Sequence, residues 1–298
     1  MLKFLTLLLL TQGLVFAGNR EDVSAYLNKL SSENDLITRM DMFSKGLVGL
    51  PYGTFGPLGE GEIGRYDQDP LYRLDTFDCT TFVETVISLS LSREINEFEE
   101  HMNQIRYQNG EIDFLKRNHF PSLQWIPYNE ENGLLVEIND LIVPVQSQKV
   151  AEAVINLPGW LKHIKIEEIR VPDASLEERQ NLLEELHQLA SSYSPVVAKL
   201  KYIPISTLLE TPSLLNKIPS GSIINFVRPN WDLTETAGTH MNVSHQGFIF
   251  RKGKEIILRH ASSSKDMKVI ESNLFEYLKK FENHPTLKGI HLMQVNAN

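Results

Sequence analysis

Apolar side chains in the first third of the chain recur at the three- and four-residue spacing of amphipathic helices. This spacing predicts helices over residues 23–30, 36–43, 82–91 and 95–105. Gly46 stops the second helix, and the residues from there to Asp75 are rich in glycine and turn residues, so we expect a long loop. Loops of this length inside compact domains are often functional.

Alternating strand patterns dominate after Lys201. They predict strands over 202–205, 222–227, 243–250, 255–261 and 289–295, with one helix over 273–281. The middle of the chain is less regular. It holds a surface helix over 173–193 with a capping-box pair at Ser175 and Glu178, preceded by scattered strand patterns of which 164–171 is the best. Helices early and antiparallel-looking strands late predict an α+β fold.

The first residues have the pattern of a secretory signal peptide. A positive head at Lys3 precedes an apolar stretch over 4–15, and Ala17 supplies a small side chain of the kind that a signal peptidase reads. The apolar stretch is shorter than the roughly 20 residues that span a bilayer. We therefore expect a cleaved signal peptide over 1–17 and a periplasmic or secreted protein with no stable membrane insertion.

The remaining chain, 18–298, is long enough for one large domain or two small ones. We find no clear linker, so we expect a single catalytic domain with a helical and irregular insertion around 110–200, acting as a monomer. Its apolar content of 42% is ordinary for a globular core. The net charge of −9 disfavours nucleic acid as a partner and leaves neutral or mixed-charge ligands open.

Cys79 is the only cysteine, so it has no disulfide partner within the chain. It stands at a predicted helix start, where Thr81 and Glu84 have capping-box spacing and where Asp78 or Thr80 could also cap. The amides and dipole of a helix start stabilise an anion, which lowers the pKa of a thiol and can also hold an oxyanion. The alternative is a small buried core residue, because free cysteine is among the most buried residue types.

Two histidines share a predicted hairpin. A two-residue loop at 252–253 makes His245 and His260 directly opposed on neighbouring strands, with Cβ atoms about 4.5–5.5 Å apart. In the functional interpretation His245 is the general base for Cys79 and His260 orients it, while Gly247 on the same face leaves room for the helix that carries the thiol. Alternatively, both histidines are satisfied hydrogen-bonding residues of a sheet.

These motifs resemble those of a known superfamily. Asp78-Cys79-Thr80, the run 244–247 and the run 260–263 are similar to the three motifs of the NlpC-type cell-wall cysteine peptidases, which have a papain-like fold. Residues 51–53 resemble the segment that places a tyrosine, here Tyr52, beside the oxyanion site. The resemblance is closer to one branch, the N-acetylmuramoyl-L-alanine amidase-like proteins. It rests on the runs 77–84, 117–119 and 218–221 and extends from about 49 to 269.

Three departures from the broad superfamily stand out. Thr80-Thr81 replaces the usual Ser-Gly after the nucleophile, an extra loop over 55–75 lengthens the spacing from tyrosine to cysteine, and Ser222 replaces a common aspartate. The first two fit the amidase branch. The resemblance then implies hydrolysis of the amide between the lactyl group of N-acetylmuramic acid and L-alanine, with soluble anhydro-muropeptides as the substrate class.

The same resemblance implies roles for seven residues. Cys79 attacks the lactyl carbonyl, helix-start amides and Tyr52 hold the oxyanion, and His245, oriented by His260, moves the proton. Asp78, Arg117 and Ser244 are candidate substrate contacts, Arg117 for a peptide carboxylate. No metal or other cofactor is required.

Other functions remain open from the sequence. A D-glutamyl-diaminopimelate endopeptidase would use the same residues on another bond. A zinc amidase would need His240 and His245, but their five-residue spacing on a strand puts them on opposite faces. A non-catalytic cell-wall binding module would use tryptophans 125, 160 and 231 as sugar platforms, and a transferase would pass the acyl group to an amine.

Overall fold

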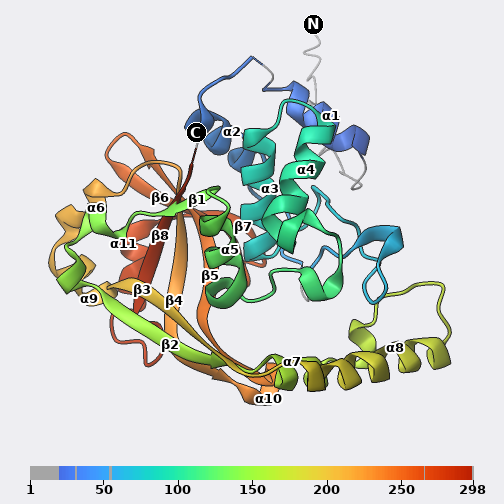
Figure 1. Ribbon diagram of the computed structural model, residues 1–298. Coiled ribbons are helices and arrows are strands. Elements are labelled where there is room, and N and C mark those ends of the chain that lie inside the picture. Colours follow the sequence, from blue (N-terminus) through green and yellow to red (C-terminus); the bar gives the residue numbers. More distant parts are fainter. Residues whose placement is uncertain (1–19, 31, 54–55, 265, 297–298) are drawn as a thin grey trace, which may run out of the picture.

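The structure is a computed structural model that describes residues 20–30, 32–53, 56–264 and 266–296. Its centre is one antiparallel sheet, beside which helices α1 to α4 pack, while α8 extends away from one end (Figure 1). The predicted signal peptide, residues 1–17, lies outside the described residues. No helix in the described part is both long and apolar enough to cross a membrane.

Within the described residues the sheet has eight strands, in the order β2-β3-β8-β4-β5-β6-β7, with β1 paired to β8. The strands are β1 (Leu135–Glu137), β2 (Lys149–Ile155), β3 (Val196–Pro204), β4 (Ser222–Leu233), β5 (Thr239–Lys252), β6 (Glu255–Ser262), β7 (Lys268–Asn273) and β8 (Gly289–Val295). The five predicted strands correspond to β3, β4, β5, β6 and β8, so the expected α+β class with an antiparallel sheet is confirmed.

One strand prediction is wrong. Residues 164–171 form no strand: Ile166–Glu168 is a short 3-10 helix, and the Arg170 N–H donates to the carbonyl of Tyr66 at 2.9 Å. In the middle of the chain the longest strand before α8 is instead β2, at 149–155. Its residues Ala151, Ala153 and Ile155 point inward, and the residues between them are exposed. Two of its three inward side chains are alanines, so the contrast between its faces is weak in the sequence.

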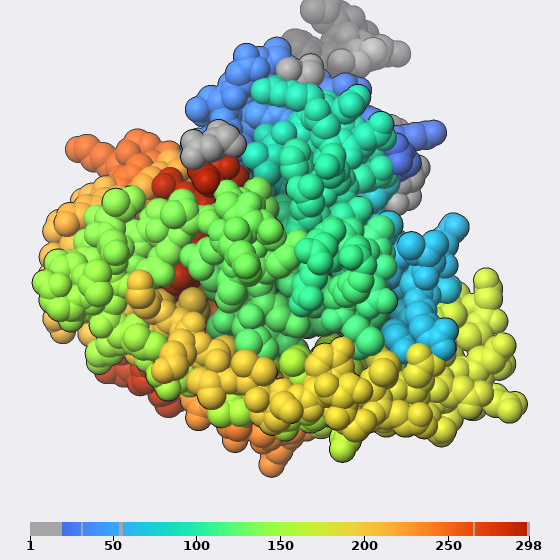
Figure 2. All heavy atoms as spheres, viewed as in Figure 1, coloured from blue at the N-terminus to red at the C-terminus, as the bar shows by residue number. Residues whose placement is uncertain are grey.

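The longer predicted helices are present. The helices are α1 (Arg20–Asn28), α2 (Leu36–Gly46), α3 (Cys79–Leu91), α4 (Ile95–Arg106), α5 (Ile126–Glu131), α6 (Asn139–Ile142), α7 (Leu157–His163), α8 (Leu176–Leu189), α9 (Ile205–Glu210), α10 (Thr234–Ala237) and α11 (Leu274–Lys279). The capping box predicted at Ser175 and Glu178 is formed at the start of α8. Figure 2 shows this helix as a band along one edge, and it is tied to the 56–75 loop where Arg65 donates to Glu185 at 2.8 Å.

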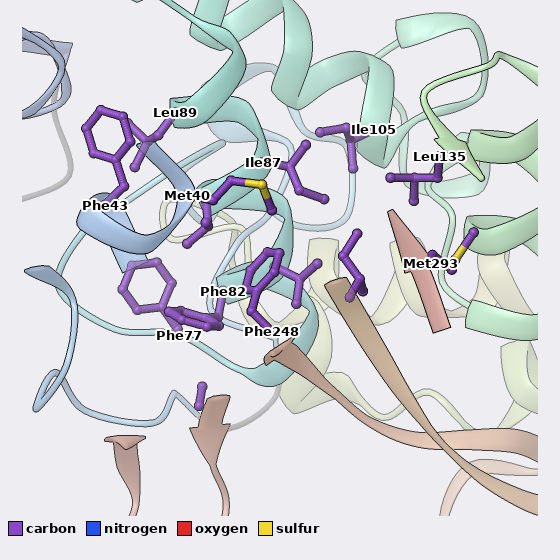
Figure 3. Packing of buried hydrophobic residues seen from close by; sticks show 14 of the residues in the cluster. Met40, Phe43, Phe77, Phe82, Ile87, Leu89, Ile105, Leu135, Phe248 and Met293 are labelled. Carbon is purple, nitrogen blue, oxygen red and sulfur yellow. The ribbon is translucent and has the colours of Figure 1, made fainter. Parts of the chain in front are cut away.

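The sheet is covered on both faces. On one face, α3 is buried from Thr81 to Ser90, and its Phe82 ring lies 5.9 Å from that of Phe248 on β5 (Figure 3). On the other face, α9 and α11 pack against Phe226, Leu258 and further sheet residues. Because neighbouring residues of a strand point to opposite faces, β5 contacts α3 with one set of side chains and faces α11 with the other.

Candidate active site

Helix α3 begins at Cys79 and is capped by the preceding residue. The Asp78 carboxylate accepts from the Thr81 backbone N–H at 2.7 Å, and the Thr81 hydroxyl accepts from the Asp78 N–H at 2.9 Å. The helix start is therefore where the sequence placed it, with Asp78 rather than Thr81 as the cap. Glu84 takes no part in the capping. Its buried carboxylate accepts from the Trp125 indole at 3.0 Å and pairs with Arg106 at 3.3 Å.

His245 on β5 and His260 on β6 are in direct contact. Nε2 of His245 and Nδ1 of His260 lie 2.6 Å apart, and the two rings meet edge to face at 82°. One nitrogen must donate to the other at this distance. The predicted contact between the two histidines is thus confirmed.

The predicted pairing of the two hairpin strands is wrong, because the turn lies one residue later in the chain than expected. Lys252 pairs with Glu255, so the loop is 253–254 rather than 252–253, and Gly253 takes the left-handed turn conformation, φ +64°. Continuing this register places His260 opposite Gly247, which makes the two histidines diagonal neighbours on the same face. A shift of one position on each strand preserves the face, and imidazoles are long enough to meet across a diagonal.

Gly247 makes room for His260, not for α3 as the sequence suggested. A Cβ atom at position 247 would lie 2.9 Å from the His260 Cβ and 2.9 Å from the Arg259 carbonyl oxygen. Real Cβ atoms are not found that close, so any larger residue would push the second histidine away. The glycine therefore permits the contact between the imidazoles.

Gln246 connects β5 to the start of α3. Its side-chain oxygen accepts from the Thr80 hydroxyl at 2.7 Å, its side-chain nitrogen donates to Asn225 at 2.7 Å, and its backbone N–H interacts with the Cys79 sulfur. Strand alternation turns Gln246 to α3 and His245 to the other face. Sequence reasoning missed Gln246, although its position after His245 was a usable signal.

The thiol is not activated at rest. Cys79 is partly exposed, but removal of water from around its sulfur raises its pKa to about 12, and the Asp78 carboxylate adds to this rise. The Gln246 N–H and the Thr80 hydroxyl, whose oxygen lies 4.0 Å from the sulfur, act in the opposite direction. The lowered pKa expected from the helix start is therefore wrong, because desolvation and a like charge outweigh the helix amides.

Both imidazoles are neutral. Burial, followed by the neighbouring His260, lowers the pKa of His245 to about 3. Burial, followed by Lys280, lowers that of His260 to about 4. If Nε2–H of His245 donates to His260, Nδ1 of His245 carries a free lone pair and can accept a proton. His260 then bears its own proton on Nε2, which is buried and has no partner in the described part of the chain.

No hydrogen bond joins the Cys79 sulfur to His245 within the described residues. The sulfur instead interacts with the backbone amide of Gln246, the residue that follows His245 on β5. Catalytic hydrogen bonds in ligand-free enzymes are often long and tighten when substrate binds. The arrangement can perform acyl transfer in which the imidazole removes the thiol proton as the sulfur attacks.

The predicted substrate contacts divide into two groups. Tyr52 is close enough to Cys79 for the two to interact, and its pKa is raised by burial and then by Cys79 and Asp78. Arg117 lies near Asp78 across Gly56, but its guanidinium donates to the Leu58 carbonyl at 2.8 Å. Ser244 lies in the wall of a cavity beside the histidines.

Two of the cavities formed by the described residues border this region. One of about 150 Å³ is lined by Arg117, His119 and Trp160. Another of about 410 Å³ is lined by His245, His260 and Trp231 among others. The third tryptophan, Trp125, is fully buried. Across the described residues, no group of three or more histidine, cysteine or acidic side chains is placed to hold a metal ion.

The chain is similar to known proteins over most of its length. The family model described as AmiA-like, N-acetylmuramoyl-L-alanine amidase-like, matches residues 42–287. The crystal structure of a Legionella pneumophila protein is 35% identical, with 93% of this chain and 94% of that chain covered, at a TM-score of 0.88. A comparison with curated proteins found no match.

More distant structures share the fold. An N-acetylmuramoyl-L-alanine amidase from Bacteroides uniformis is 22% identical, with 88% of this chain and all of that chain covered, at a TM-score of 0.63. A Bacteroides fragilis protein provisionally described as a xylanase is 23% identical, with 85% and 99% covered, at a TM-score of 0.58. At this level of identity the likeness shows the fold alone. The two structures are described with different activities, amidase and xylanase.

Proposed function

The chain belongs to the N-acetylmuramoyl-L-alanine amidase-like family, and from this premise we propose that it is a cysteine-dependent amidase acting on peptidoglycan fragments. The bond that we propose it hydrolyses joins the lactyl group of N-acetylmuramic acid to L-alanine. The observation that supports this most is the combination of a helix-start thiol, Cys79, with a neutral histidine pair on the adjoining hairpin.

The first half of the proposed reaction forms a thioester. The Cys79 sulfur attacks the lactyl carbonyl carbon while Nδ1 of His245 takes the thiol proton, so no free thiolate accumulates despite the high pKa of the thiol. The negative charge that develops on the carbonyl oxygen is held by amides at the start of α3 and by the Tyr52 hydroxyl. His245, now protonated, is stabilised through its hydrogen bond to His260.

Collapse of the tetrahedral intermediate breaks the carbon–nitrogen bond. His245 gives its proton to the departing alanine nitrogen, and the peptide leaves as an amine. Neutral His245 then accepts a proton from water, which attacks the thioester and releases the muramoyl acid together with the Cys79 thiol. Atoms and protons balance without any further cofactor.

The resemblance to the amidase branch supports soluble anhydro-muropeptides as the substrate class. The leading residues support action outside the cytoplasm, which fractionation of cells that produce the full chain would test. Mass spectrometry of digests, comparing intact sacculi with anhydro-disaccharide-peptides, tests the substrate. We expect free disaccharide and free peptide from the fragments. Cleavage only between D-glutamate and the diamino acid would instead assign the endopeptidase activity.

A further inference from the structure

The cavity of about 410 Å³ has the composition of an anion-binding site. Its walls contain two cations, Arg228 on β4 and Lys280 at the end of α11, together with the aromatic rings of Trp231 and Tyr277. None of the described residues that line it is acidic. A cavity with cations and aromatic faces but no carboxylate favours a ligand that carries a negative charge.

No acidic side chain balances the charge of Arg228 within the described residues. Its Nη1 donates only to neutral groups, the Thr286 hydroxyl and, at 3.4 Å, Nδ1 of His284. Its buried Nε has no hydrogen-bond partner among the described residues, and no carboxylate there forms an ion pair with it. Arg106 and Arg259, which are more deeply buried, each have an acidic partner. Arg39 and Arg251 also lack an ion pair in the described part of the chain, but several backbone carbonyls accept from their guanidinium groups. Because a buried charge is costly without a partner, Arg228 is suited to receive one from a ligand.

Trp231 fixes the position of this guanidinium. The Arg228 group lies over the Trp231 ring, 5.1 Å from its centroid, which restrains the planar fork. A restrained guanidinium matches the two oxygens of a carboxylate better than a free side chain does.

The cavity joins directly onto the histidine pair. His245 and His260 form part of its wall, and the Tyr277 ring lies 5.3 Å from His260. In the proposed reaction His245 must reach the nitrogen that departs, so the peptide attached to this nitrogen lies along the wall that holds His245. Arg117, the residue that the sequence suggested for a peptide carboxylate, lines the other cavity, which contains neither histidine.

We propose that this cavity binds the departing peptide and that Arg228, assisted by Lys280, recognises a carboxylate on it. The inference rests on the proposed amidase function. It adds that the cavity holds the peptide portion of the substrate. With this contact, the enzyme should prefer a substrate whose peptide has free carboxylates after the alanine. The same substrate with these carboxylates amidated should be cleaved less efficiently.

The test uses two probes, anhydro-N-acetylmuramoyl-L-alanyl-D-glutamate and the same compound with both glutamate carboxyls amidated. We expect the wild type to favour the free acid by about tenfold or more in kcat/KM, mainly through KM, because a hydrogen bond to a charged group is lost in the amide. Arg228→Gln should reduce this preference to about threefold or less, and Arg228→Lys should keep part of it. Arg65→Gln, an exposed arginine paired with Glu185, is the matched control and should leave the preference unchanged.

The outcomes separate the inference from the function on which it rests. If the wild type cleaves both probes between lactyl and alanine with equal efficiency, the cavity assignment is wrong and the amidase function stands. Equal losses on both probes in Arg228→Gln would likewise overturn it, since a structural defect affects both. If Arg228→Gln does not fold, Lys280→Gln takes its place. A smaller preference for the free acid in Lys280→Gln than in the wild type supports the cavity assignment, and an equal preference overturns it. Cleavage of neither probe by the wild type contradicts both proposals.

Discussion

Nε2 of His245 and Nδ1 of His260 lie 2.6 Å apart, although the two residues are diagonal rather than opposed in their hairpin. The contact exists because Gly247, opposite His260, carries no side chain. When His245 donates from Nε2, this contact leaves its Nδ1 free to accept a proton. The hairpin thus supplies a neutral base in the residue before Gln246, whose backbone amide interacts with a thiol that is itself neutral at rest.

Removing the second imidazole should lower turnover more than binding. For His260→Ala we expect kcat to fall about a hundredfold or more with KM nearly unchanged, because His245 loses the partner that sets its tautomer. His260→Gln, which can still accept from His245, should recover part of the loss. His187→Ala on α8 is the control. Equal kcat for His260→Ala and wild type would contradict the positioning role.

Adding one methyl group at position 247 should disrupt the same contact. Gly247→Ala places a Cβ 2.9 Å from that of His260, so we expect destabilisation of about 1–3 kcal/mol and a fall in kcat. The double variant Gly247→Ala/His260→Gly should be less destabilised than the sum of its single variants, because the second substitution removes the Cβ atom at position 260. Additive free energies of unfolding, measured in urea, would show that the clash lies elsewhere.

The histidine pair should make stability depend on pH. Both residues have a lowered pKa in the folded state, so the unfolded chain binds protons first as pH falls below about 6.5. Stability is therefore lost as pH falls from about 6.5 towards 4. Relative to His245→Phe/His260→Phe, we expect the wild type to lose on the order of 5 kcal/mol more between pH 7 and pH 4.5. The free energy of unfolding is measured in urea at each pH. An equal loss of this free energy in the two proteins over this range would be inconsistent with neutral buried imidazoles.

Gln246 should align the thiol with the base. Gln246→Ala removes the acceptor for Thr80 and leaves Asn225 without its donor, so the start of α3 loses its tie to β5. We expect kcat to fall about tenfold or more, with slower alkylation of Cys79 by iodoacetamide at pH 8. Gln180→Ala, on the exposed surface of α8, serves as the comparison. An unchanged alkylation rate in Gln246→Ala would argue against the alignment role.

The sequence was informative where local rules decide the structure. Asp78 before Cys79 is a strong cap followed by apolar residues, so the helix start could be predicted, and hairpin alternation put both histidines on one face. The exact turn was not predictable, because Lys252, Gly253 and Lys254 allow two positions for a two-residue loop. In the folded structure the loop is 253–254, and Gly253 in this loop has a left-handed φ of +64°.

Properties that depend on tertiary surroundings could not be predicted. The pKa of Cys79 is set by how much water the fold removes, and no local pattern reports that quantity. Arg228 in the sequence is one of many arginines. Its significance comes from the absence of an acidic partner in the described surroundings, which only the packed structure reveals.

The most direct test of the central claim is product analysis of wild type and Cys79→Ala with an anhydro-muropeptide, with iodoacetamide and EDTA as separate treatments. We expect the wild type to release the L-alanyl peptide, and we expect this release to be lost in Cys79→Ala and after alkylation but to persist in EDTA. Circular dichroism of the variant checks that it is folded. Turnover by Cys79→Ala at the rate of the wild type, or loss of turnover to EDTA with indifference to iodoacetamide, would contradict the thiol mechanism.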